Sequence, residues 1–164
     1  MPVTTESELL RGLDEGEMRA VRALALAPVR LQAGEVLFHL GAAAESLFLI
    51  ERGRISLTLP MRVDGREADL LVEEKVGGQV VGWSALIPPH RFTLKATAPV
   101  EGELLALPRV ELLALFARRP EVGYRVTRNL AAIVGQRLHV FQAMWLRQMQ
   151  RLVEGTGAWA GAGQ

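Results

Sequence analysis

Apolar residues recur with two different periods along the chain, and the changes of period divide it into three parts. Over residues 6–25 they recur at helical spacing, which predicts a helix. Over residues 29–108 they recur at alternate positions in short runs, which is typical of β-strands. From residue 109 the helical period returns. It predicts a short helix that stops before Pro120 and one long helix over 121–154.

Short apolar runs in the middle part are predicted as strands, and glycines separate them. These runs are residues 36–38, 47–50, 55–59, 70–72, 92–96 and 104–107. Regular short strands with turn signals between them indicate a sandwich or a barrel. The pair Asp64-Gly65 is a strong signal for a type I′ hairpin between two of the strands.

Local signals mark the ends of the helices. Asp14 and Glu17 have the spacing of a capping box, Pro28 closes the first helical region, and Gly155 is expected to stop the long helix. The chain is therefore divided into an N-terminal helical segment (1–27), a strand-rich domain (28–108), two helices (109–154) and a flexible Gly/Ala-rich tail (155–164).

The long helix is apolar on more than one face. One stripe comprises Leu138, Phe141, Trp145 and Leu152, and a second comprises Val126, Ile133, Val140 and Met144. A helix of this kind needs cover on two sides. One side can pack on the chain's own strands, and the same helix of a second copy is the simplest cover for the other. We expect a homodimer, and the alternative is a helix buried within a monomer.

Composition restricts the class of protein. A length of 164 residues fits one domain, and a net charge of +1 gives no strong attraction to nucleic acid. The absence of cysteine excludes disulfides, thiolate catalysis and iron–sulfur clusters. The sequence shows no signal peptide and no apolar run long enough for a membrane span. We expect a cytoplasmic protein that does not contact a membrane.

The candidate catalytic residues do not form a recognisable site. The histidines His39, His90 and His139 lie on different predicted elements, without ligand spacing for a metal. Ser46, Ser56 and Ser84 have no neighbouring His–carboxylate arrangement. We therefore expect no enzyme activity, no bound metal and no cofactor other than a possible nucleotide ligand.

Residues 80–93 interrupt the strand pattern with a glycine, a turn of small residues, two prolines and an arginine. Gly82 permits close backbone approach, and Ser84 is expected to cap a short helical turn that Pro88 and Pro89 end. Arg91 would then return a guanidinium toward the free amides of that turn. Such an arrangement holds phosphate groups. The plainer interpretation is a glycine–proline loop with one solvated charge.

Three motifs, in order and at plausible spacing, resemble the cyclic nucleotide-binding domain family. They are Leu31-x-x-Gly34-Glu35-x-Leu37-Phe38-x-x-Gly41, Leu47-Phe48-Leu49-Ile50-x-x-Gly53-x-Ile55-x-Leu57, and Gly78-Gln79-x-x-Gly82 with the segment to Arg91. The resemblance runs from about residue 8 to residue 150. It implies an α+β, mainly β fold: an antiparallel β-roll or jelly roll flanked by N-terminal helices and a long C-terminal dimerisation helix. Residues 80–93 would be its phosphate-binding cassette.

The resemblance also implies ligand-binding residues, with two departures from the family pattern. Arg91 matches the arginine that pairs with the cyclic phosphate, but Trp83 stands where a glutamate usually binds the ribose hydroxyl. An indole has no acceptor for that hydroxyl. Phe92 replaces a usually small residue. The expected ligand-binding residues are Gly82, Trp83, Ser84, Ala85, Arg91, Phe92 and Thr93, with Phe141 and Gln142 meeting the base.

Two functions follow from these residues. In the first, the domain senses a nucleotide or another anionic ligand, with weak or altered specificity for cyclic AMP. In the second, Trp83 and Phe92 fill the pocket and the domain is a ligand-free dimerisation or scaffold module. Either one would act through a downstream protein partner. Only ten residues follow Glu154, too few for a recognition helix, so we expect no direct DNA binding by these residues.

Overall fold

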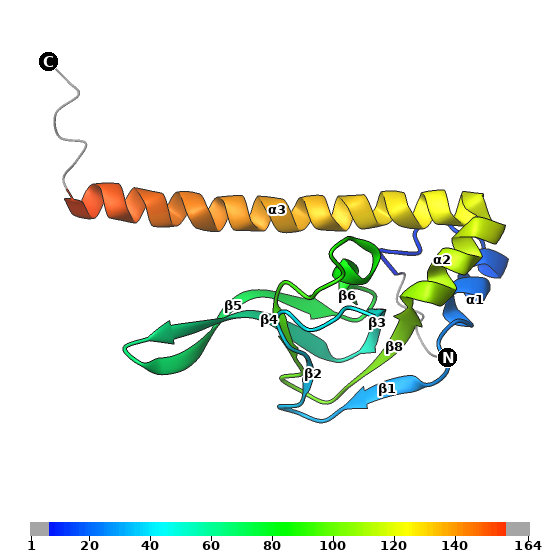
Figure 1. Ribbon diagram of the computed structural model, residues 1–164, viewed down its shortest axis with the longest axis horizontal. Helices are drawn as coiled ribbons and strands as arrows, with labels where there is room; N and C mark the ends of the chain where they lie inside the picture. The colour runs from blue at the N-terminus through cyan, green and yellow to red at the C-terminus, as the bar shows by residue number, and fades with distance from the viewer. Residues whose placement is uncertain (1–6, 157–164) are drawn as a thin grey trace, which may run out of the picture. The chain divides into compact units, whose positions relative to one another are not determined.

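The computed structural model describes residues 7–156, which divide into two compact units, one ending at Asn129 and one beginning at Leu130 (Figure 1). The elements are α1 (Glu15–Arg22), β1 (Pro28–Leu31), β2 (Val36–Phe38), β3 (Ser46–Arg52), β4 (Arg54–Val63), β5 (Arg66–Val76), β6 (Val80–Val81), η1 (Trp83–Leu86), β7 (Lys95–Thr97), β8 (Gly102–Pro108), α2 (Arg109–Arg118) and α3 (Pro120–Thr156). The boundary between the units falls within α3.

Helix α1 is shorter than the apolar spacing predicts. It starts at Glu15 because the capping box forms: Asp14 accepts from the Glu17 amide at 2.8 Å, and the Asp14 amide donates to the Glu17 carboxylate at 2.9 Å. The expected helix over the residues before it is wrong, since residues 8–12 form turns. Gly12 has a φ of +80°, a left-handed conformation that no α-helix continues through. Residue 6 lies outside the described part of the chain.

The N-terminal segment is bonded to the first turns of α3, within the first unit. The carboxylate of Glu17 is buried and accepts from Arg125 Nη1 at 2.8 Å. The side-chain amide of Asn129 donates to the carbonyl groups of Leu9 and Arg11, at 2.8 and 2.9 Å. These bonds place α1 and the turns before it at the same end of the unit as the start of α3.

Two antiparallel four-stranded sheets form the body of the first unit, in the orders β1-β8-β3-β6 and β2-β7-β4-β5. This confirms the mainly β fold class. Five of the predicted strands lie within β2, β3, β4, β5 and β8, whereas the pattern does not predict β1 and β6. The predicted strand 92–96 is only partly right, because Phe92 exchanges backbone bonds with Gly41 and Ala42 and only the chain from Lys95 joins β7.

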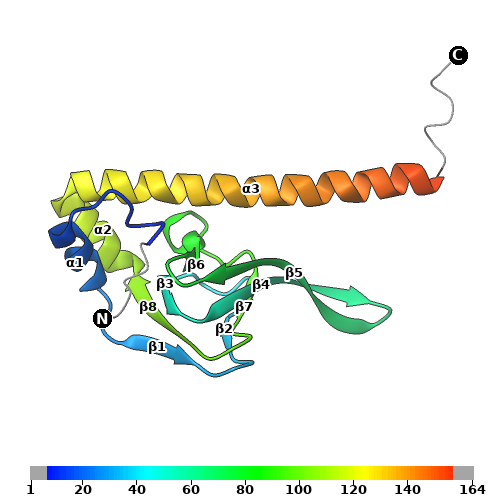
Figure 2. The ribbon, with the colours of Figure 1, turned by 180° about the vertical axis from the view of Figure 1, so that it is seen from behind.

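Strands β4 and β5 form the longest hairpin and project from the sheet in both views (Figures 1 and 2). Their turn has Asp64 at φ +50° and Gly65 at φ +77°, between the paired residues Val63 and Arg66. Two successive positive φ values in a two-residue loop match the predicted type I′ turn.

The core is built from the facing sides of both sheets. One row of cross-strand neighbours runs from Phe38 through Ala96 to Leu57, on β2, β7 and β4, and all three side chains are buried. The other sheet contributes fully buried leucines, which are Leu47, Leu49, Leu104 and Leu107. The cassette begins with β6, which is the edge strand of the sheet β1-β8-β3-β6.

Helix α2 stops before Pro120, as predicted, and α3 begins at that proline, which needs no amide donor at the first position of a helix. The pKa of Glu121 in the first turn lies below its usual value, chiefly because of a backbone hydrogen bond and then because of Arg119. Helix α3 continues to Thr156, so Gly155 does not stop it. The flexible tail predicted over 155–164 is therefore wrong at Gly155 and Thr156, which are helical, and its remaining residues lie outside the described part of the chain. No described helix combines the length and hydropathy needed to cross a bilayer.

Candidate ligand-binding site in the cassette

The backbone of residues 80–90 forms the short helical turn expected between two strands. Gly82 follows β6 with a φ of +79° and begins the 3-10 helix η1. The turn ends at Leu86, before Pro88 and Pro89, which are joined by a cis peptide bond. His90 then takes a left-handed conformation, with a φ of +57°.

The predicted capping role of Ser84 is wrong. The cap residue is Gly82, which has no side chain to bond, and Ser84 lies one residue inside the turn with its side chain buried. The reason is the left-handed conformation of Gly82, which starts the helix two residues earlier than a cap at Ser84 would. The first bond of the turn runs from the Ala85 amide to the Gly82 carbonyl at 3.1 Å. The amides of Trp83 and Ser84 precede it and have no acceptor within the turn.

Arg91 lies on the exposed side of the cassette. Its Nη1 donates to the Gly41 carbonyl at 2.9 Å, and its backbone forms an isolated antiparallel bridge with Ala43. Flanking bonds from Ala44 to the His90 carbonyl and from Phe92 to the Ala42 carbonyl hold the two segments together. Within residues 7–156, Arg91 forms no ion pair with a carboxylate. The cassette therefore carries a positive charge that the described chain does not neutralise.

Gly82 is placed against aromatic rings, so a larger residue would crowd its neighbours. A Cβ atom at this position would lie 3.1 Å from the Phe92 ring, 3.3 Å from the Phe48 ring and 3.3 Å from the Ser46 carbonyl oxygen. The positive φ of the glycine independently disfavours a side chain. Both the turn conformation and the close approach to the sheet therefore favour glycine at this position.

Phe92 points into the core rather than toward solvent. It is 7% exposed, and its ring stacks on Phe38 with the centroids 3.7 Å apart. Phe38 in turn lies 6.0 Å from Phe48. These three phenylalanines, called here the aromatic cluster, occupy the inner side of the cassette. Trp83 is only half-buried and stacks on no other described ring.

The remaining predicted site residues differ in exposure. Ala85 is fully buried, whereas Thr93 is exposed beside Phe92. Phe141 and Gln142 are exposed residues of α3 and belong to the second compact unit. Gly41 and His90 also contact the cassette, although the sequence motifs do not assign them to the ligand site. Gly41 belongs to the first family motif, but its carbonyl contact with Arg91 spans 50 positions, so local sequence could not predict it.

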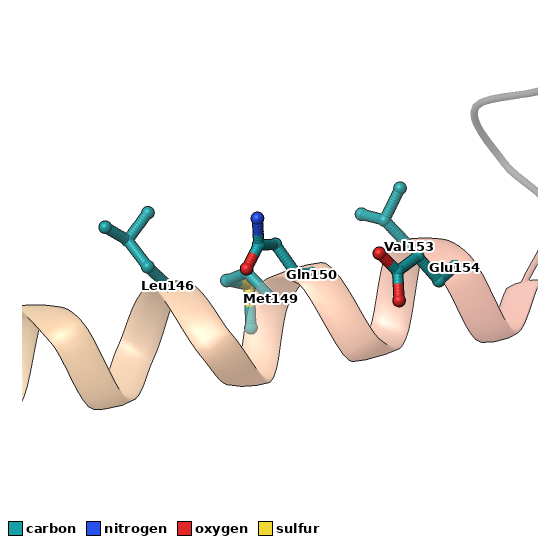
Figure 3. A pocket seen from close by; sticks show the side chains of 5 residues that line it. All are labelled: Leu146, Met149, Gln150, Val153 and Glu154. Atoms are coloured by element: carbon teal, nitrogen blue, oxygen red, sulfur yellow. The ribbon is translucent and has the colours of Figure 1, made fainter.

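A hollow also lies beside the last turns of α3. The described side chains that line it are Leu146, Met149, Gln150, Val153 and Glu154 (Figure 3). All five belong to the same helix, and no group of three or more potential metal ligands gathers within the described residues. The cassette is therefore the better candidate for a ligand site.

Comparison with known proteins identifies the family to which the chain is similar. A sequence model of the cyclic nucleotide-binding domain matches residues 28–119. The cyclic AMP receptor protein of Thermus thermophilus is 31% identical over 105 residues, which cover 64% of this chain and 45% of that protein. The chain thus spans about half the length of this curated relative.

Solved structures show the same likeness. The catabolite activator protein of Thermus thermophilus superposes with a TM-score of 0.70 at 27% identity, covering 88% of this chain and 63% of the other. The N-terminal domain of a transcriptional regulator from Streptomyces coelicolor A3(2) gives a TM-score of 0.66 at 29% identity, covering 82% and 93%. The family model covers more than half of the chain, from β1 to the end of α2. The chain therefore belongs to the cyclic nucleotide-binding domain family.

Proposed function

We propose that this chain is a regulatory domain that senses a nucleotide or another phosphorylated, anionic small molecule bound at its cassette. The observation that carries the proposal is the guanidinium of Arg91, which is exposed and has one carbonyl partner, Gly41, and no described carboxylate partner. A guanidinium has five N–H donors, so most of its donors remain for an oxyanion. The role is regulatory rather than catalytic, with a protein partner downstream.

The specificity we propose differs from ordinary cyclic AMP binding. Trp83 offers one donor and no acceptor, so it cannot accept a hydrogen bond from a ribose hydroxyl. Phe92 occupies space on the inner side of Gly82 that a small residue would leave open. We therefore expect cyclic AMP to bind weakly.

Calorimetry with Arg91→Ala tests the proposal. We expect wild type to bind at least one of cyclic AMP, cyclic GMP and a cyclic dinucleotide, and Arg91→Ala to weaken that binding by about tenfold to a hundredfold. This is the equivalent of losing a charged hydrogen bond of about 1.5–3 kcal/mol. Arg62→Ala is the matched control, because Arg62 is an exposed arginine near the hairpin turn and pairs with no described carboxylate.

Equal heats from wild type and Arg91→Ala would contradict the role of the guanidinium. No heat from wild type with any of the three nucleotides would support the second function, a ligand-free dimerisation or scaffold module. The aromatic cluster favours that alternative, since Phe38, Phe48 and Phe92 already fill the inner side of the cassette.

We further propose that the chain forms a homodimer through α3. The side chains of the first predicted stripe remain exposed on the helix, with Leu138 at 57% and Trp145 at 64%. Phe141 and Leu152 continue the stripe at 38% and 59% exposure. The same stripe on a second copy is the simplest apolar surface of matching length and spacing.

A charge in the middle of this stripe should separate the copies. We expect Trp145→Glu to convert a dimer into a monomer by light scattering, because a carboxylate without a partner is costly inside an apolar interface. Gln136→Glu makes the same charge change about half a turn away from the stripe and should leave the mass unchanged. A monomeric mass for wild type at high concentration would exclude the proposed dimer.

A further inference from the structure

Residues 8–13, called here the N-terminal turn, are bonded to the first strand of the cassette. The Glu8 amide donates to the Gly78 carbonyl at 2.9 Å, and the Glu8 carboxylate accepts from the Val80 amide at 3.1 Å. Val80 and Val81 form β6, whose other side pairs with β3. Glu8 thus covers the open edge of a two-residue strand, and its carboxylate is a charged acceptor for a backbone donor.

Helix α3 holds the N-terminal turn from the other side. The side-chain amide of Asn129 donates to the carbonyl groups of Leu9 and Arg11, at 2.8 and 2.9 Å. Arg125, one helical turn earlier on the same face of α3, donates to the buried Glu17 carboxylate at 2.8 Å. Side chains from two successive turns of α3 therefore bind the N-terminal turn and the start of α1.

The N-terminal turn is packed into the core, whereas β6 is short. Leu9, Leu10 and Leu13 are buried, and the amides of Leu10 and Leu13 donate to the carbonyl groups of Ser7 and Leu10, at 3.2 and 3.1 Å. Close-packed segments transmit a displacement to their neighbours because they have little room to absorb it. A strand of two residues is not stable by itself, so its order depends on what it is bonded to.

We propose that the N-terminal turn is a clamp that makes the order of β6, and of the cassette turn that follows it, depend on Asn129 of α3. Val81 directly precedes Gly82, so the position of β6 determines where the cassette turn begins. Within residues 7–156 Glu8 forms no ion pair, so no cation draws its carboxylate away from Val80. The clamp requires no bound ligand. A partner that displaced the start of α3 would loosen the cassette.

Hydrogen exchange of the Val80 amide, followed by nuclear magnetic resonance without ligand, tests the clamp. We expect Asn129→Ala to speed this exchange about three- to tenfold, because the N-terminal turn loses two hydrogen bonds. The amides of Leu104 and Leu107 in β8 should stay within about twofold of wild type, since the change is local. Alanine forms helices better than asparagine does, so a weaker α3 would not be the cause.

Two further changes make the test specific. Thr127→Ala raises helix propensity at an exposed position of α3 and should leave the exchange of Val80 unchanged. In Glu8→Ala the Val80 amide has lost its acceptor, so adding Asn129→Ala should then change its exchange by less than about twofold. Glu8→Gln keeps an acceptor oxygen and should retain most of the wild-type protection.

Three results would overturn the clamp: unchanged exchange of Val80 in Asn129→Ala, an equal acceleration in β8, or effects that multiply in the double variant. If Asn129→Ala does not fold, the reciprocal measurement decides. The side-chain amide signal of Asn129 should shift in Glu8→Ala and stay near its wild-type position in Glu8→Gln, and a signal that does not move in Glu8→Ala would also overturn the clamp. Anion binding at Arg91 is tested separately by calorimetry, so either proposal can fail without the other.

Discussion

Gly53→Ala is expected to lower the free energy of unfolding by about 3 kcal/mol or more, through backbone strain and overpacking together. Gly53 joins β3 to β4 with a φ of +92°. An added Cβ would lie 2.7 Å from the Glu101 carbonyl oxygen and 2.7 Å from the Gly102 Cα. Both obstacles are backbone atoms, so relief requires a strand connection to move rather than a side chain to turn.

Urea unfolding followed by circular dichroism measures this effect. Gly34→Ala is the matched control, because Gly34 has a similar φ of +88° but no atom within 4 Å of an added Cβ. It should cost about 1–2 kcal/mol, the strain of the left-handed conformation alone. Similar losses in the two variants would show that the contact with Glu101 and Gly102 does not matter.

Phe92→Ala is expected to cost about 3–5 kcal/mol, the usual range for truncating a buried phenylalanine. The ring is 7% exposed and stacks on Phe38 at 3.7 Å, so its removal leaves a cavity beside Gly82. Because the cluster joins the cassette to β2, the loss should be accompanied by faster hydrogen exchange at the cassette amides.

Two further variants show whether the packing of the ring is responsible. Phe92→Leu keeps most of the volume and should cost only about 1 kcal/mol. Thr93→Ala alters the exposed neighbour and should change stability by no more than about 0.5 kcal/mol. A small loss in the free energy of unfolding for Phe92→Ala would mean that the remaining rings close the cavity. It would weaken the scaffold alternative, which relies on Phe92 to fill the inner side of the cassette.

The two residues that depart from the family pattern, Trp83 and Phe92, differ in how they pack. Phe92 belongs to the aromatic cluster, so its size is accommodated by the core on the inner side of Gly82. Trp83 is half-buried in η1 and outside that cluster. The contacts show that Phe92 packs beside Gly82, and the expectation that both residues fill one ligand pocket stays a prediction.

Local patterns in the sequence determined the elements whose signals lie within a few residues. The Asp64-Gly65 turn, the capping box of Asp14 and Glu17, and the start of α3 at Pro120 all follow from the conformational preferences of adjacent residues. The alternation of apolar positions likewise indicated most strands and the mainly β class. These features need no knowledge of what a segment packs against.

Only the tertiary structure decided where the cassette side chains lie. Arg91 meets the Gly41 carbonyl across 50 positions. Phe92 stacks on Phe38 because its backbone is bonded to Gly41 and Ala42, shortly after β2. The start of the helix at Trp83 rather than after a serine cap depends on the left-handed Gly82 beneath the aromatic rings. Such contacts depend on which strands pair and on how the side chains between them pack. Neither can be predicted from the conformational preferences of neighbouring residues in the chain.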